Sequence, residues 1–209
     1  MKKNKEKAQS YYIKAAALGE EGGINFLGAF QFNNQMMGAN RDSSANLFRK
    51  AAQSGNNARA MNNLGICFER GYADCEQNRE KAMQLYEKSA KLGYCPAMVN
   101  RAYLHYKIAS ETECEYDKSD HYFECSNWLR LALSRNEDIK DAQYLMGHLY
   151  ENGYSVDKNM AAAFDCYQKA SDLGCIKSMT KIGHMYYSGV KVHNDRDEFA
   201  TDEEITTMN

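Results

Sequence analysis

The sequence predicts an all-α fold, a right-handed α/α superhelix or solenoid of antiparallel helix pairs in about five repeats. Three observations lead to this prediction. A small residue recurs at the centre of alternate helical stretches, an aromatic residue recurs in the stretches between them, and glycines close most of the latter. A single proline in 209 residues is compatible with a nearly all-helical chain. An ordinary helical bundle is the alternative, but a bundle does not require a sustained period.

The clearest unit spans residues 142–174. Gly147 lies at the centre of its first helix, and Ala163 and Tyr167 share one face of its second helix. The small residues let the two helices approach closely, and the tyrosine fills the space beside them. Gly174 suits the left-handed conformation that stops a helix.

These positions recur along the chain at successive spacings of 37, 37, 45 and 36 residues. The central small residues of the first helices are Gly28, Gly65, Ala102, Gly147 and Gly183. The aromatic residues of the second helices are Tyr12, Phe48, Tyr86, Trp128 and Tyr167. Closing glycines stand at Gly19, Gly55, Gly93 and Gly174. A sustained period of this length, built from two helices, indicates units that bury their faces only against neighbouring units.

The expected units form a single array over residues 1–195. They lie near residues 5–19, 22–55, 58–93, 96–135, 139–174 and 176–195. The helix expected at residues 5–18 matches a second helix with no first helix before it, which leaves its apolar face uncovered. An end-to-end contact with a partner would cover it, and so would continuation in a longer array, which we favour. Residues 196–209 are predicted to be an acidic tail or an incomplete final repeat.

The third unit is irregular. Its first helix is expected at about residues 96–110, with Ile108 where a loop glycine is usual, and its second helix cannot be aligned before Trp128. About six additional residues therefore lie around residues 111–120, ETECEYDKSD. The pattern does not decide whether they extend the loop or lengthen a helix.

The repeated motif resembles the Sel-1-like repeat (SLR), a relative of the tetratricopeptide repeat with a longer unit. The matching residues of the clearest unit are Ala142, Met146, Gly147, Tyr150, Gly153, Val156, Ala163, Tyr167, Lys169, Ala170 and Gly174. The resemblance covers about residues 5–195 and implies an α-solenoid. It also implies a role in assembling protein complexes, as in endoplasmic-reticulum quality control, activation of cell-wall synthesis or bacterial host interaction, without selecting among these.

Composition argues against several classes of protein. The formal net charge is -2 and no basic cluster stands out, so we expect no nucleic-acid partner. Seven cysteines, an odd number, occupy no repeated position, and no Asn-x-Ser/Thr site occurs, so a reducing, cytoplasmic environment is expected. No apolar run approaches the roughly 18 residues of a membrane-spanning helix, so direct membrane insertion is not expected.

Catalytic motifs are weak. Ser178 with Lys181, and Ser188 with Lys191, match the Ser-x-x-Lys pattern of serine beta-lactamases, but the accompanying Ser-Asp-Asn and Lys-Thr-Gly motifs are absent. No zinc-type ligand spacing and no phosphate-binding loop occur. We therefore predict no catalytic residue, metal site or cofactor. A beta-lactam-hydrolase-like enzyme, and a regulatory or targeting segment of a larger enzyme, are the alternatives.

Function is expected on the concave face, which the resemblance to tetratricopeptide-type solenoids implies is lined by the first helices. The predicted partner-binding residues are Asn25, Phe32, Asn62, Glu69, Arg70, Val99, Tyr103, Tyr106, Lys107, Tyr144, His148, Glu151, His184 and Tyr187. The middle of this set is rich in tyrosine, which is enriched in interface hot spots but can equally cover neighbouring helices. The predicted function is that of a non-enzymatic scaffold or adaptor that holds a partner protein or peptide.

Overall fold

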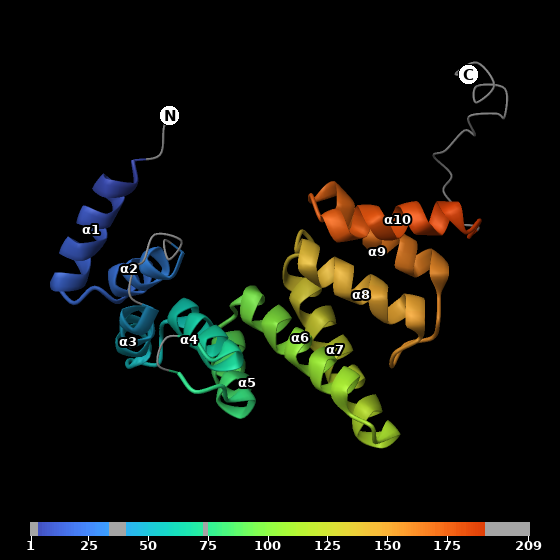
Figure 1. The fold of residues 1–209 in the computed structure, drawn as a ribbon, viewed down its shortest axis with the longest axis horizontal. Coiled ribbons are helices and arrows are strands. Elements are labelled where there is room, and N and C mark those ends of the chain that lie inside the picture. The colour runs from blue at the N-terminus through green and yellow to red at the C-terminus, as the bar shows by residue number, and fades with distance from the viewer. Residues whose placement is uncertain (1–3, 34–40, 73–74, 191–209) are drawn as a thin grey trace, which may run out of the picture.

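The computed structural model describes residues 4–33, 41–72 and 75–190, and these residues form helices joined by short loops, with no strand among them (Figure 1). The described helices are α1 (Lys5–Ala17), α2 (Glu21–Asn33), α3 (Arg41–Ala52), α4 (Ala58–Arg70), α5 (Arg79–Lys91), α6 (Cys95–Glu111), α7 (Glu115–Arg135), α8 (Lys140–Asn152), α9 (Met160–Asp172) and α10 (Ile176–Tyr187).

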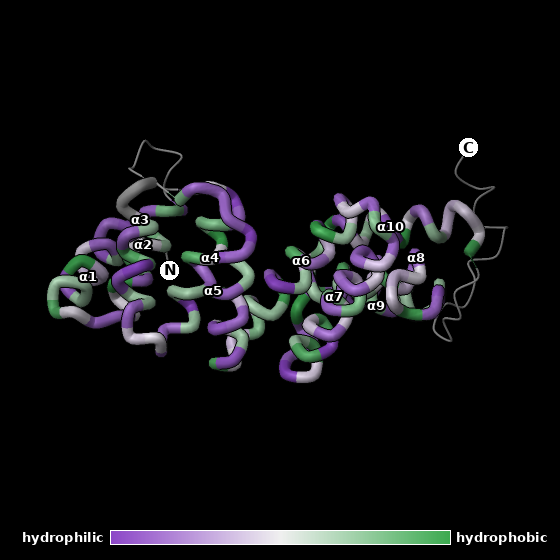
Figure 2. The backbone as a smooth tube through the Cα atoms, turned by 90° about the horizontal axis from the view of Figure 1, so that it is seen from below, coloured by the Kyte–Doolittle hydropathy of each residue, from purple (hydrophilic) through white to green (hydrophobic). Residues whose placement is uncertain are grey.

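The helices pair in chain order and the pairs stack into an elongated array. The most extensive contacts join α2 with α3, α4 with α5, α6 with α7, and α8 with α9, and each pair then packs on the next. Helix α1 packs on α2 at one end, and α10 packs on α9 at the other (Figure 1). Hydrophilic and hydrophobic residues alternate along the helices, as Figure 2 shows. The predicted all-α superhelical repeat fold is confirmed.

Local chemistry explains where several helices begin and end. The side chains of Asn57, Asn78 and Asn159 cap α4, α5 and α9 by accepting hydrogen bonds from backbone N–H groups of the first turn. Gly71 and Gly153 follow α4 and α8 in the left-handed conformation, with φ of 65° and 73°. A side chain is disfavoured at such angles, which is why glycine recurs at these helix ends.

The central glycines of the first helices allow close packing within each unit. A Cβ atom on Gly65 would lie 2.6 Å from the ring of Tyr86, and one on Gly147 would lie 2.8 Å from the ring of Tyr167. Both tyrosine side chains are fully buried. Each glycine therefore leaves space for the aromatic residue of the second helix. The recurring glycine and the recurring aromatic residue of the sequence are thus two sides of one helix–helix contact.

The irregular third unit accommodates its additional residues in longer helices. Helix α6 has 17 residues and α7 has 21, whereas the other described helices have 12 or 13. Only residues 112–114 separate α6 from α7. The added turns bury Ala109 on α6 and Tyr122 and Cys125 on α7 in one cluster. Burial of these apolar groups favours extension of both helices over a longer loop.

Three further expectations concern the C-terminal residues, the cysteines and membrane insertion. Residues 191–195 of the last predicted unit, and the predicted tail at 196–209, lie outside the described residues. All seven cysteines lie among the described residues, and none of them is joined to another in a disulfide. Among the described helices, none combines the length and hydropathy that a bilayer-spanning segment needs.

Candidate partner-binding groove

A groove lies where the first helices of four consecutive units meet. It has a volume of about 410 Å³ and receives residues from α4, α6, α8 and α10. We call it the central groove, and its main lining residues are Arg70, Val99, Tyr103, Lys140, Tyr144 and Lys177. Four of these were among the predicted partner-binding residues, namely Arg70, Val99, Tyr103 and Tyr144.

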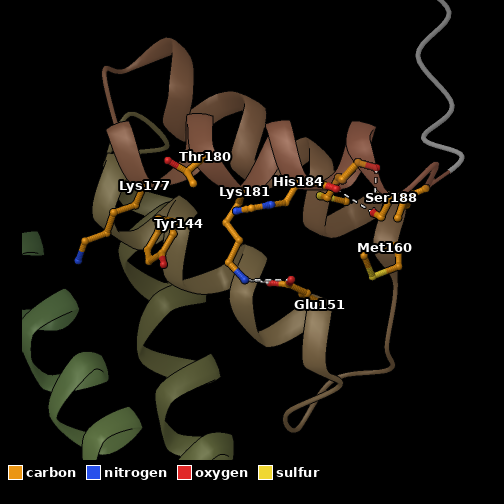
Figure 3. Close-up of a pocket in the computed structure, with 10 residues that line it drawn as sticks. Tyr144, Glu151, Met160, Lys177, Thr180, Lys181, His184 and Ser188 are labelled. Atoms are coloured by element: carbon orange, nitrogen blue, oxygen red, sulfur yellow. Dashed lines mark hydrogen bonds and ion pairs between the residues drawn. The ribbon is translucent and has the colours of Figure 1, made fainter.

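A second hollow adjoins the central groove along α8 and α10. Its volume is about 600 Å³, and Tyr144 and Lys177 line both cavities. Figure 3 shows this second hollow, in which Lys181 and His184 of α10 lie above Glu151 of α8. The shared residues join the two hollows into one surface. Predicted residues Tyr144, Glu151 and His184 therefore come together here, whereas Tyr187 lines neither hollow.

Tyr103 and Tyr144 provide the aromatic surface of the central groove. The side chain of Tyr103 is 44% exposed, and its ring stacks on Tyr106 with centroids 6.4 Å apart. The ring of half-buried Tyr144 lies 5.8 Å from that of Tyr167. The Nζ atoms of two lysines flank these rings, Lys107 at 4.9 Å from Tyr103 and Lys177 at 5.9 Å from Tyr144. Both tyrosines are thus held by neighbours and still contribute open surface.

Tyr106 and His148 form a contact between the third and fourth units. The Tyr106 hydroxyl lies 3.3 Å from His148 Nδ1, and the two rings meet edge to face at 5.5 Å. Tyr106 also packs against Tyr122, with centroids 5.7 Å apart. Burial raises the pKa of Tyr106 to about 12 and lowers the pKa of His148. Tyr106 and His148 therefore pack between repeats, although both remain half-buried rather than enclosed.

The carboxylate of Glu151 is held by two groups at the floor of the second hollow. It accepts a 2.6 Å hydrogen bond from the Tyr167 hydroxyl. It also accepts a 2.7 Å bond from Lys181 Nζ, which Figure 3 shows. Burial opposes the charge, but the bonds from Lys181 and Tyr167 keep the pKa of Glu151 below its ordinary value. Because Lys181 is engaged with Glu151 and Ser178 is fully buried, this Ser-x-x-Lys pair lacks the exposed serine and available amine of a nucleophilic site.

Comparison with known proteins identifies the repeat. The Sel1 repeat family model matches residues 1–20, 23–56, 58–94 and 140–175. The chain belongs to the Sel1 repeat family. The unmatched stretch between residues 94 and 140 contains the lengthened helices of the third unit. The suspected resemblance is therefore confirmed, and Sel1 repeat proteins generally mediate protein–protein interactions and are generally non-catalytic.

Two solved structures share the Sel1 repeat fold. A Sel1 repeat protein from Oxalobacter formigenes aligns with a TM-score of 0.72 at 20% identity, covering 90% of this chain and 74% of that chain. A protective antigen of uropathogenic Escherichia coli with an SLR fold aligns with a TM-score of 0.52 at 23% identity, covering 90% of this chain and 45% of that chain. At these identities the likeness concerns the fold alone.

A curated relative is the ERAD-associated E3 ubiquitin-protein ligase component HRD3A of Arabidopsis thaliana. It is 29% identical over 115 residues, a match that covers 52% of this chain and 16% of HRD3A. The chain therefore matches only a small part of the length of that relative.

Sel1 repeat packing buries several residues that sequence position alone placed on the open face. Asn25 and Asn62 are 3% and 4% exposed. Each accepts a hydrogen bond from an asparagine of the next repeat, Asn25 from Asn63 at 3.0 Å and Asn62 from Asn100 at 2.8 Å. Val99 is also buried, although its edge borders the groove. The following repeat covers these side chains, so they mainly join repeats to one another.

The remaining predicted residues lie in other settings. Glu69 is buried and forms an ion pair with Lys107 at 2.8 Å, so the charges of these two side chains are already paired with each other. Phe32 lines a separate small hollow of about 160 Å³ with Phe48. Tyr187 is 93% exposed on α10. Six of the fourteen predicted residues line the two adjoining hollows, namely Arg70, Val99, Tyr103, Tyr144, Glu151 and His184.

The rim of the central groove is rich in positive charge, which the sequence reasoning missed. Arg70, Lys140 and Lys177 are exposed, and none of them forms an ion pair with another described residue. Asp141 is the acidic residue of the lining. Lys140 and Lys177 lie in the first turns of α8 and α10, at positions that the inward-facing pattern did not include. Three cations and one carboxylate give the groove a net positive rim.

Proposed function

We propose that this Sel1 repeat chain is a non-enzymatic adaptor that holds a protein or peptide partner in the central groove. The observation that carries the proposal is the convergence of Tyr103 and Tyr144 on one groove at the junction of four first helices. Tyrosines of this kind combine apolar area with a hydroxyl group, which suits interface anchors. The general role of Sel1 repeats in protein–protein interaction supports the same conclusion.

The chemistry of the groove favours a partner segment with a hydrophobic or aromatic anchor and neighbouring carboxylates. The anchor would lie against Tyr103 and Tyr144, and the carboxylates would face Arg70, Lys140 and Lys177. These cations are free to pair with a partner because no described carboxylate engages them. Charge complementarity of this kind contributes mainly to the association rate and to specificity, whereas the apolar contact supplies affinity.

A second candidate is a regulatory or targeting segment of a larger enzyme assembly. The match to HRD3A favours it, because that protein is a component of a ubiquitin-protein ligase and the matched region is 16% of its length. In this case the groove would hold another subunit of the assembly. The two candidates differ in the identity of the captured partner, a catalytic subunit or another class of protein, and not in the surface used.

The test compares two variants in affinity capture from native lysate with quantitative mass spectrometry. The groove variant is Tyr103→Ala/Tyr144→Ala. Tyr106 is left intact because its ring packs against Tyr122 and His148. The control is Tyr116→Ala/Phe123→Ala, which removes two exposed aromatic side chains from α7, outside both hollows.

We expect at least one protein to be retained by the wild type and by the control and to be lost by the groove variant. Circular dichroism should show that both variants keep their helical content. Capture of the same proteins by all three chains would contradict the proposal, because binding would then not depend on the groove.

A further inference from the structure

In complete repeats, the face around the central glycine of the first helix is covered by the second helix of the same unit. A Cβ atom on Gly28 would lie 2.8 Å from the ring of Phe48, which repeats the close contacts at Gly65 and Gly147. The residue four positions before each central residue is buried as well. These residues are Ile24, Met61, Met98 and Gln143, all at most 5% exposed.

Helix α10 presents the same face without a cover in the described structure. Apart from the backbone of α10 itself, no atom of the described residues lies within 4 Å of a Cβ placed on Gly183. Met179, four positions before it, is 48% exposed, and Tyr187, four positions after it, is 93% exposed. With Ile176, these residues form one stripe along the helix, on the side opposite the buried residues Ser178 and Met185. Among the described residues, α10 is therefore a first helix without its second helix.

Helix α1 presents the complementary half of a repeat. Ala8 and Tyr12 lie eleven and seven residues before the closing Gly19, the same positions as Ala82 and Tyr86 relative to Gly93. Ala82 and Tyr86 are fully buried, whereas Ala8 and Tyr12 are only half-buried, and α1 has no buried residue at all. The Tyr12 ring stacks on Phe26 of α2 at 5.5 Å, so this face of α1 packs partly on α2 and stays partly accessible.

We propose that the uncovered face of α10 binds α1 of a second copy of this chain, which completes a hybrid repeat. In that repeat Ala8 and Tyr12 of the second copy lie against Gly183, as Ala163 and Tyr167 lie against Gly147. Tyr12 also meets Tyr187, in the way that Phe48 meets Phe32 with ring centroids 6.3 Å apart. Two different surfaces make this contact, so the association is head to tail and can extend into linear assemblies.

The chemistry of residues 191–209 makes them a poor cover for α10. In this segment, which lies outside the described residues, Phe199 and Glu203 stand 36 positions after Ala163 and Tyr167. A phenylalanine in place of alanine would crowd the helix crossing, and a carboxylate in place of tyrosine would lose its hydration against an apolar stripe. Helix α1 instead carries the alanine and the tyrosine that the crossing requires.

The test uses one blocking variant for each end. Gly183→Leu fills the space above α10, where no other described residue lies within 4 Å of the added Cβ. Ala8→Arg places a long charged side chain on the partly accessible face of α1 that also carries Tyr12. Circular dichroism controls for folding, and sedimentation velocity over a wide concentration range measures the mass of each 209-residue protein.

We expect the wild type to associate reversibly into species larger than a dimer as its concentration rises. Each variant alone should stay monomeric, and an equimolar mixture of the two variants should form a dimer, because each retains the end that the other lacks. Three results would overturn the proposal: a wild type that stays monomeric throughout, a Gly183→Leu variant that associates as the wild type does, or association that begins only when residues 191–209 are removed. The last result would mean that these residues cover α10.

Discussion

The phenol of Tyr86 donates a 2.8 Å hydrogen bond to the carboxylate of Glu69, and both side chains are buried. The same carboxylate binds Lys107 of the next first helix at 2.8 Å. The group Tyr167, Glu151 and Lys181 repeats this arrangement two units later. Each carboxylate therefore links the second helix of its own unit to the first helix of the following unit, and polar groups as well as apolar packing hold the array together.

Replacing Glu69 with alanine should destabilise the protein by about 1–3 kcal/mol, because it leaves the buried Tyr86 hydroxyl without its acceptor. Urea unfolding followed by circular dichroism measures the effect. Glu80→Ala is the matched control, since Glu80 is exposed on α5 and its loss should change stability by less than about 0.5 kcal/mol. Equal losses in the two variants would show that the Glu69 bridge contributes little.

Leucine should have opposite effects at two equivalent glycines. At Gly147 its side chain would collide with the Tyr167 ring, where even a Cβ atom would lie 2.8 Å away, and we expect a loss of about 1–3 kcal/mol. At Gly183 no other described residue lies within 4 Å of an added Cβ, and the higher helix propensity of leucine should stabilise the chain by about 0.5–1 kcal/mol. Thermal melting at a dilution where both proteins are monomeric tests this, and equal melting temperatures would contradict the packing described.

The fold was predictable because the repeat signal is local. A glycine and an aromatic residue at fixed offsets, such as Gly65 and Tyr86, specify how two adjacent helices cross. The third unit was less predictable because Ala102 replaces the glycine, and Ile108 replaces the glycine that would end the helix. Burial of Ala109 and Tyr122 decides the length of α6 and α7, and this depends on contacts between the two helices that spacing does not reveal.

The groove was predictable only in part, because helix periodicity gives the direction of a side chain and not what covers it. The inward-facing pattern found Tyr103 and Tyr144, which remain accessible. It also selected Asn62 and Glu69, which the following repeat buries. Lys177 was missed because it lies in the first turn of α10, outside the repeated positions counted along each first helix.

Acidification should destabilise the fold through His105, which is buried in the third unit. His105 Nδ1 lies 3.0 Å from His121 Nδ1, and burial, with smaller contributions from Arg101 and His121, lowers the pKa of His105 to about 4. In the unfolded chain its pKa is about 6.5, so the unfolded state binds a proton first as pH falls. The stability contribution is therefore complete above pH 6.5 and declines toward pH 4.

His105→Gln tests this prediction because glutamine keeps polar groups but does not titrate. Between about pH 7 and pH 5, the wild type should lose about 2 kcal/mol more stability than the variant, measured by urea unfolding at each pH. Parallel losses would show that other groups cause the acid sensitivity. The carboxyl of Glu87 contributes little in this range, because its pKa is about 4.5 in the unfolded chain and hydrogen bonds from Lys91 and Arg101 lower it to about 2 in the folded chain.

Reversing one charge at the rim of the central groove should weaken partner binding. Lys177→Glu is expected to raise the Kd of a captured partner by about fivefold, or about 1 kcal/mol, because carboxylates of the partner would then be repelled. Lys50→Glu is the control, since Lys50 is exposed on α3, away from the groove. Equal affinity of the two variants, measured by calorimetry, would show that rim charge does not attract the partner.

Site-specific photocrosslinking tests the central claim most directly. The photoreactive residue p-benzoylphenylalanine is placed at Tyr103 in the groove or, as the control, at exposed Tyr116 on α7. After irradiation in native lysate, we predict that the partner whose capture depends on the groove is crosslinked from position 103 and not from position 116. Crosslinking of that partner from position 116 alone would contradict the assignment of the central groove as the partner-binding surface.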